Sequence, residues 1–157
     1  RFVITDRRNA AIVAKEMNAT HMISLLDPDV PVFRPSHLEP DNHLWLTFRD
    51  LGKPANGGPQ RHHVERLLSF GRDLTEDSIV VIHCEAGISR STAAAFLLLA
   101  QAMGPERARE AIDLVLQVRP QAFPNTLITR FGDEILGTGN ALTREAERAC
   151  SKPFLLS

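Results

Sequence analysis

Along this chain, segments whose apolar residues have the spacing of a strand alternate with segments whose apolar residues have the spacing of a helix. Short runs that are apolar or alternate in polarity predict strands at residues 2–5, 21–26, 43–48 and 79–82. The last of these runs is apolar at every position, which is typical of a strand covered on both faces. Strands interleaved with helices predict an α/β fold with a central, mostly parallel sheet of four or five strands flanked by helices.

Helical spacing of apolar residues predicts five helices. The expected ranges run from Asp6 to Met17, Gln60 to Leu74, Arg90 to Met103, Pro105 to Pro120 and Asn125 to Gly137. Asp6 and Asn125 are candidate N-terminal caps. The range 90–103 is apolar almost all round, which indicates a central buried helix. We expect residues 1–157 to form a single domain in which 138–157 make a frayed helix and a tail.

Two loops interrupt the pattern. Residues 27–42 contain four prolines and no period, and a loop of this length in a small domain is typical of the rim of a functional site. Five of the eight residues from 52 to 59 are glycine or proline, which predicts a loop able to flex.

Composition narrows the classes of function. The chain has 157 residues, with 18 basic and 19 acidic side chains, so it has no excess charge for general binding to nucleic acid or to a membrane surface. The longest apolar run, 93–100, is too short to cross a bilayer. The chain lacks a start Met and a signal-peptide pattern, so we expect a trimmed cytoplasmic protein. Two cysteines, Cys84 and Cys150, do not make a disulfide framework.

The segment from His83 to Ser91 lies where a predicted buried strand ends and the predicted buried helix begins, a place where α/β sheets bind ligands. A tight turn there would direct backbone N–H groups inward as a cradle for phosphate. Gly87 allows the tight backbone, and the fork of Arg90 can grip two phosphate oxygens. The cradle would consist of Glu85, Ala86, Gly87, Ile88, Ser89 and Arg90.

Cys84 is the candidate nucleophile. A thiol at a helix N-terminus beside a guanidinium should have a lowered pKa. Ser91 can donate a hydrogen bond to its sulfur, and His83 can hold the loop by bonding backbone groups. A thiolate below a bound phosphate can attack it and form a cysteinyl-phosphate intermediate. The alternative is a buried, inert cysteine in a strand–helix turn.

The motif His-Cys-x5-Arg-Ser from His83 to Ser91 resembles the signature of the cysteine-dependent protein tyrosine phosphatases, and most closely their compact bacterial and dual-specificity types. The resemblance extends over residues 1–137. It implies that Cys84 is the nucleophile, Arg90 the phosphate clamp and Ser91 a helper in thiolate release. It also implies a phosphorylated protein or peptide as substrate, phosphotyrosine above all and phosphoserine or phosphothreonine as well. Phosphate, sulfate or vanadate would fit the loop, and no metal or cofactor would be needed.

In this family the general acid is an upstream carboxylate. Asp50 is the main candidate because it follows a predicted strand and precedes the loop 52–59, 34 positions before Cys84. Asp41 is the second candidate. For either residue, the alternative is a carboxylate that caps a turn.

Several other interpretations stay open. A rhodanese-like sulfurtransferase or an arsenate reductase also uses an anion loop that begins with cysteine, although the Arg90-Ser91 ending and Asp50 disfavour both. A phosphatase of non-protein phosphomonoesters and a silent phosphate-binding module are further alternatives. The loop contains no lysine, which argues against an inositol lipid. His62 and His63 have no partner spaced for a metal, and Cys150 could pair with Cys84 only if the tail folded back.

Overall fold

The computed structural model describes residues 1–151 and contains one four-stranded sheet in the order β1-β4-β2-β3, with every neighbouring pair parallel. The strands are β1 (Phe2–Thr5), β2 (His21–Leu26), β3 (His43–Thr47) and β4 (Val80–His83). In the register, Ile82 of the central strand β4 lies opposite Ile4 on one side and Ile23 on the other. The predicted fold class is therefore confirmed, and all four strands lie within one residue of their predicted ranges.

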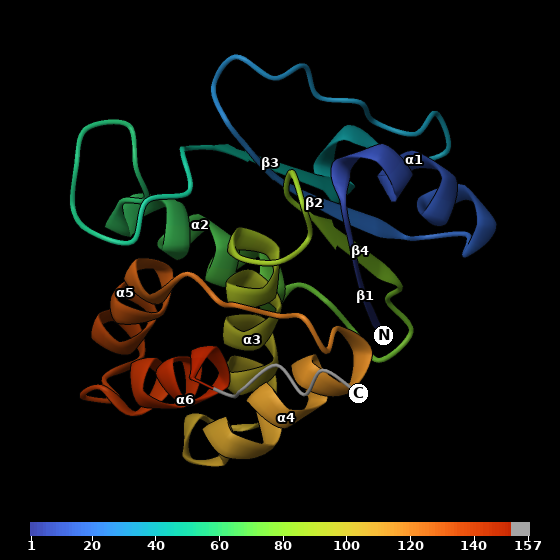
Figure 1. Cartoon of the computed structure of the whole chain (residues 1–157). Coiled ribbons are helices and arrows are strands. Elements are labelled where there is room, and N and C mark those ends of the chain that lie inside the picture. The colour runs from blue at the N-terminus through green and yellow to red at the C-terminus, as the bar shows by residue number, and fades with distance from the viewer. Residues whose placement is uncertain (152–157) are drawn as a thin grey trace, which may run out of the picture.

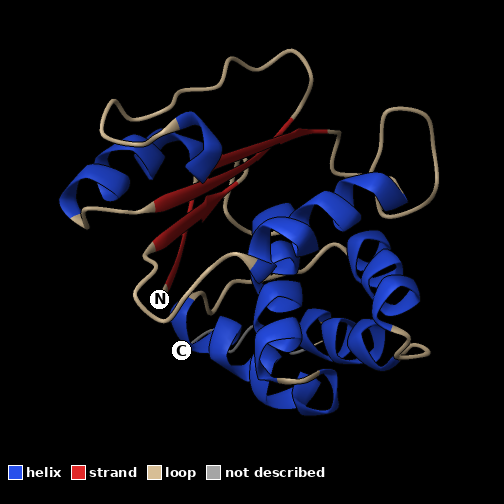
Figure 2. Cartoon of the chain, turned by 180° about the vertical axis from the view of Figure 1, so that it is seen from behind, coloured by secondary structure: helices blue, strands red, loops and turns tan. Residues whose placement is uncertain are grey.

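The sheet separates two unequal layers of helices (Figures 1 and 2). Helix α1 (Arg7–Glu16) covers one face, above a small core. The other face is packed against a group of helices, and the larger core lies between them and the sheet. These helices are α2 (Arg61–Arg72), α3 (Arg90–Met103), α4 (Ala108–Val118), α5 (Thr126–Leu136) and α6 (Ala141–Cys150).

Helix α3 lies at the centre of this layer, as its apolar sequence predicts. Ten of its 14 residues are buried, and it contacts the sheet as well as α2, α4 and α5. Small side chains such as Ala93, Ala94 and Ala95 let its neighbours approach closely. The first turn of α3 is thereby held against the end of β4, which is where the chemical motif lies.

The prediction of a frayed helix from residue 138 is wrong for the described part of that range. Helix α6 packs Leu142, Ala146 and Ala149 into the core, and a carboxylate from α5 caps its first turn. Asp133, which is only 3% exposed, accepts hydrogen bonds from the N–H groups of Leu142 and Thr143 at 2.9 and 3.0 Å. A cap supplied by another helix leaves no local signal in the sequence. Residues 152–157 of the predicted tail lie outside the described residues.

Another correction concerns residue 105. Pro105 begins a 3-10 turn, Pro105–Arg107, and the α-helix starts only at Ala108. A proline has no N–H and a fixed φ, so it fits the first position of either kind of helix, and the sequence alone did not separate them.

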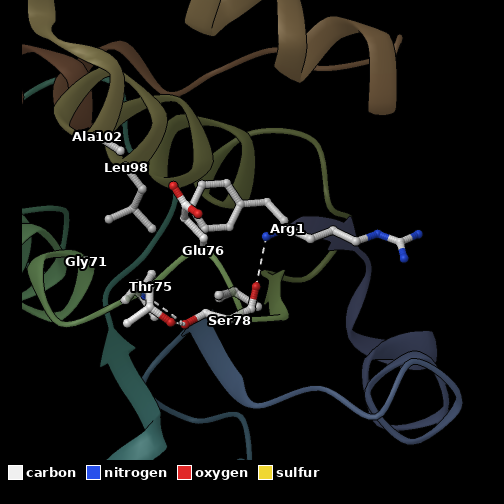
Figure 3. A pocket seen from close by; sticks show the side chains of 10 residues that line it. Arg1, Gly71, Thr75, Glu76, Ser78, Leu98 and Ala102 are labelled. Atoms are coloured by element: carbon white, nitrogen blue, oxygen red, sulfur yellow. Dashed lines mark hydrogen bonds between the residues drawn. The ribbon is translucent and has the colours of Figure 1, made fainter.

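Because all four strands are parallel, their carboxyl ends meet at one edge of the sheet. The segments that follow β2, β3 and β4 all begin at that edge. A cavity of about 260 Å³ lies at the opposite edge, by the start of β1 and of β4, where the amino group of Arg1 donates to the carbonyl of Ser78 at 2.8 Å (Figure 3). This cavity therefore does not adjoin the motif. Within residues 1–151, no helix has the length and apolar character needed to cross a membrane.

Candidate active site

The turn between β4 and α3, residues 84–89, has its carbonyl groups bound on the outside. Carbonyl oxygens of five consecutive residues accept hydrogen bonds from other segments of the chain. The pairs are Arg7 N–H to Glu85, Arg119 Nη2 to Ala86, Arg119 Nε to Gly87, Phe123 N–H to Ile88 and Asn125 N–H to Ser89, at 3.1, 3.1, 2.9, 2.8 and 3.2 Å. Two segments far apart in the sequence, the start of α1 and residues 119–125, thus hold the turn from outside.

These bonds orient the N–H groups of the turn. A peptide plane directs its C=O and the N–H of the next residue in opposite directions. Since the carbonyls of residues 85–89 point outward, the N–H groups of residues 86–90 point into the turn and form a cradle for an anion. Gly87 has a φ of +69°, and a Cβ atom there would lie 2.7 Å from the Thr5 carbonyl and from the Arg119 guanidinium. Only glycine fits this position.

Cys84 directly precedes the residues of this cradle and is buried, with an exposed fraction of 3%. Its Sγ atom is 3.2 Å from Oγ of Ser91. Burial by itself raises the pKa of the Cys84 thiol, but hydrogen bonds from Ser91 and from the N–H of Gly87, together with the charge of Arg90, outweigh burial and lower that pKa below its ordinary value. A lowered pKa favours the thiolate, which is the reactive form of a cysteine.

Arg90 is buried, and one side of its guanidinium is already occupied. Its Nη1 atom donates to Oδ1 of Asp27 and to the carbonyl of Phe48, each at 2.7 Å. Its Nε atom is buried and has no hydrogen-bond partner among the described residues. A buried donor without a partner is costly, so the edge formed by Nε and Nη2 is the one left to bind a ligand. That edge has the two-pronged geometry that matches a phosphate.

The structure brings Asp50 to the turn and leaves Asp41 away from it. Oδ1 of Asp50 accepts hydrogen bonds from Oγ of Ser89 at 2.7 Å and from Nδ2 of Asn125 at 2.8 Å. Asp41 lies in a short 3-10 turn, Pro40–Asn42, before the amino end of β3. Asp50 follows the carboxyl end of the same strand, so the two candidates lie at opposite edges of the sheet.

His83 is the last residue of β4 and belongs to a buried hydrogen-bond chain. Its Nδ1 atom lies 3.2 Å from the carbonyl of Cys84, so Nδ1 must carry the proton and donate. Its Nε2 atom then accepts from the hydroxyl of Ser24 at 2.6 Å, and that hydroxyl accepts from Nε2 of His43 at 2.8 Å. Burial lowers the pKa of His83 and favours the neutral ring, and the hydrogen bonds have this direction when His83 is neutral.

We expect the free energy of unfolding to fall as the pH drops from 6.5 to 4, because His43, at the end of this chain of hydrogen bonds, resists protonation in the folded protein. Burial, with the nearby His83 and Arg34, lowers the pKa of His43 to about 4, against an ordinary value of about 6.5. The unfolded chain therefore binds more protons in this range, and the stabilisation is complete above pH 6.5 and lost toward pH 4. The loss should be about 1 kcal/mol, since His43 is only partly buried.

Thermal melts of the wild type and of His43→Gln between pH 4 and 8 measure this effect. His63, whose pKa burial also lowers to about 4, remains in both proteins and contributes equally to both curves. The His43→Gln curve should be the flatter one, and parallel curves would contradict the prediction.

Three residues singled out in the sequence, His62, His63 and Cys150, lie apart from this chemistry. The rings of His62 and His63 are tilted by 43° with centroids 4.1 Å apart. Residues 1–151 contain no cluster of three or more His, Cys, Asp or Glu side chains able to hold a metal. Sγ of Cys150, at the end of α6, lies 3.7 Å from the carbonyl of Pro124. Cys84 and Cys150 are both free thiols.

Sequence reasoning assigned no chemistry to three residues that shape the site: Asp27, Arg119 and Asn125. Asp27 had a usable signal, since it is the first residue after β2 and so lies at the carboxyl edge of the sheet. Asn125 was predicted only as a helix cap, which it is, with Oδ1 accepting from the N–H of Ile128 at 3.0 Å. The role of Arg119 could not be predicted, because the sequence around an arginine does not show which distant carbonyl groups its guanidinium will bind.

The fold is that of the dual-specificity-type, cysteine-based protein tyrosine phosphatases, as the resemblance predicted. Among solved structures, human DUSP28 superimposes with a TM-score of 0.67 at 15% identity, covering 89% of this chain and 94% of that one. A mouse putative dual specificity phosphatase complexed with zinc tungstate superimposes with a TM-score of 0.63 at 21% identity, covering 87% and 82%.

Two curated relatives are similar to this chain in sequence. The chain is 28% identical over 113 residues to MAP kinase phosphatase with leucine-rich repeats protein 2 of Dictyostelium discoideum, and 29% identical over 136 residues to protein 3 of that name. The matches cover 71% and 83% of this chain but only 14% of each relative. No protein-family model matches the chain.

Proposed function

We propose that this chain is a protein phosphatase that hydrolyses phosphotyrosine through a cysteinyl-phosphate intermediate, with phosphoserine and phosphothreonine as further substrates. The observation that carries the proposal is the Nε atom of buried Arg90, which has no hydrogen-bond partner within residues 1–151 and lies beside inward N–H groups and a thiol of lowered pKa. Such a site suits a tetrahedral dianion whose phosphorus lies within reach of a thiolate. The relative described with zinc tungstate supports an oxyanion as ligand.

The residues would divide the reaction into two displacements. In the first, the Cys84 thiolate attacks phosphorus, a sulfur–phosphorus bond forms, and the bond to the leaving oxygen breaks as Asp50 gives that oxygen its proton. In the second, water attacks phosphorus, Asp50 takes a proton from the water, and Cys84 leaves as thiolate. Ser91 stabilises the thiolate at both stages, and Arg90 with the cradle binds the three oxygens that gain charge.

The test is hydrolysis of a panel of phosphotyrosine, phosphoserine and phosphothreonine peptides in EDTA, with and without vanadate, using Cys84→Ser as reference. We expect vanadate-sensitive release of phosphate that depends on Cys84 and persists in EDTA. Thiocyanate formed from thiosulfate and cyanide, or arsenite formed from arsenate, would show one of the alternative enzymes. Turnover of small phosphomonoesters without turnover of any peptide would favour a non-protein substrate. Binding of phosphate without any turnover would identify a silent module.

Asp50→Ala should slow aryl phosphates with poor leaving groups by about 10²–10³-fold, within the range of general acid catalysis. Activated aryl phosphates, whose phenolates leave without a proton, should be slowed much less. The alkaline limb of the turnover profile should also flatten, because it reports loss of the proton from the acid. Rates for a series of aryl phosphates of increasing leaving-group pKa measure this, with Asp41→Ala as the matched control. Equal slowing across the series, or the pattern appearing in Asp41→Ala instead, would overturn the assignment.

A further inference from the structure

Asp50 is held through only one of its two carboxyl oxygens. Both of its donors, Oγ of Ser89 and Nδ2 of Asn125, bind Oδ1, at 2.7 and 2.8 Å. No hydrogen bond among residues 1–151 involves Oδ2 of Asp50. A carbonyl oxygen has two lone pairs and can accept two such bonds, whereas a protonated oxygen is a poor acceptor. In the neutral acid, therefore, Oδ1 is the carbonyl oxygen and Oδ2 carries the proton.

The amide of Asn125 has only one possible orientation. Oδ1 of Asn125 accepts from the N–H of Ile128 at 3.0 Å and thereby caps α5. The two hydrogens of Nδ2 go to Asp50 and to the carbonyl of Leu51, at 2.8 and 3.0 Å. Every polar atom of this buried side chain is thus used, and a flipped amide would break all three bonds.

We propose that Asn125 and Ser89 are positioning residues that hold Asp50 by Oδ1, so that Oδ2 is the oxygen that exchanges protons with the substrate. This inference rests on the proposed function. As the phosphorus–oxygen bond breaks, the proton on Oδ2 moves to the leaving oxygen. As water later attacks the phosphorus bound to Cys84, one proton of that water returns to Oδ2. The two bonds to Oδ1 persist in both charge states, so the carboxyl group does not have to reorient between the steps.

Substitutions at Asn125 can separate its role in positioning Asp50 from its role as the cap of α5. Serine and aspartate are both good N-terminal caps, so Asn125→Ser and Asn125→Asp keep an acceptor for Ile128 N–H. Asn125→Ser removes the amide donor. Asn125→Asp replaces it with an acceptor that faces Oδ1 of Asp50 and should raise the pKa of Asp50. For the second donor, Ser89→Ala removes the hydroxyl, and Ser89→Thr retains it.

The experiment measures kcat/KM against pH for aryl phosphates of low and high leaving-group pKa. Asn125→Ser and Ser89→Ala should each slow the poor leaving groups by about 10-fold and the activated ones by less than about 3-fold. Ser89→Thr should recover most of the rate lost in Ser89→Ala. In Asn125→Asp the alkaline limb of the profile of kcat/KM against pH should move to higher pH by about one unit.

A double-substitution cycle provides the control for folding. If Asn125 acts through Asp50, then Asn125→Ser should lower kcat/KM by less than about 2-fold in a protein that already carries Asp50→Ala. Equal slowing of all leaving groups by Asn125→Ser, an unmoved alkaline limb in Asn125→Asp, or additive losses in the cycle would each overturn the inference. If the wild type shows no hydrolysis that depends on Cys84, the proposed function itself fails, and this outcome is visible before any variant of Asn125 is made.

Discussion

Replacing Cys84 by serine should reduce hydrolysis by about 10⁴-fold or more, since no other group in the site can take over covalent attack. A hydroxyl has a much higher pKa than a thiol, so Ser91 and Arg90 cannot ionise it at neutral pH. The cradle consists of backbone N–H groups and Arg90, and the substitution leaves all of these in place. We therefore expect Cys84→Ser to retain affinity for phosphate and tungstate, which calorimetry can measure next to the loss of turnover.

Cys150 provides the matched control, because its environment has the opposite effect on a thiol. Burial raises the pKa of Cys150, helped by the charge of Glu147, whereas the pKa of Cys84 is lowered. Cys150→Ser should keep wild-type turnover, and iodoacetamide at pH 6 should inactivate the wild type by labelling Cys84 rather than Cys150. Phosphate in the cradle should protect Cys84 from this reaction. Substantial turnover in Cys84→Ser would exclude covalent catalysis by this residue.

Arg90→Lys should be nearly as damaging as Arg90→Ala, with a loss of about 10³-fold in turnover for each. Nη1 of Arg90 is already bound to Asp27 and to the carbonyl of Phe48, and only the Nε/Nη2 edge is left for phosphate. A lysine ammonium is a single point and cannot serve both sides at once. Removal of one preorganised donor costs about 10²–10³-fold in turnover, and this substitution disturbs more than one.

Binding measurements separate Arg90 from Cys84. Both Arg90 variants should lose affinity for phosphate and tungstate, whereas Cys84→Ser should keep it. Arg107→Lys is the control, since Arg107 pairs with exposed Glu110 at the start of α4, and its turnover should not change. Turnover of Arg90→Lys within a few-fold of wild type would mean that Arg90 contributes only general positive charge.

Local patterns in the sequence were sufficient for the layout of the fold and for the place of the motif between β4 and α3. Hydrophobic spacing is set by the geometry of a strand or a helix, so the four strands and α3 could be located without knowledge of their neighbours. The motif His83 to Ser91 is contiguous, and its nine residues contain the thiol, the guanidinium and the cradle. Chemistry that is complete within one turn of the chain can be predicted from the sequence.

Only the tertiary structure decided which distant residues join that turn. Asp27 reaches Arg90 across 63 positions, and Asn125 reaches Asp50 across 75. Both contacts depend on the parallel order β1-β4-β2-β3, which brings the carboxyl ends of β2, β3 and β4 to one edge. Strand β3 lies between Asp41 and Asp50 and places them at opposite edges of the sheet, although the two residues are only nine positions apart in the chain. Helix α6 was misjudged for the same reason, because its cap, Asp133, belongs to α5 and no pattern within 138–157 reveals it.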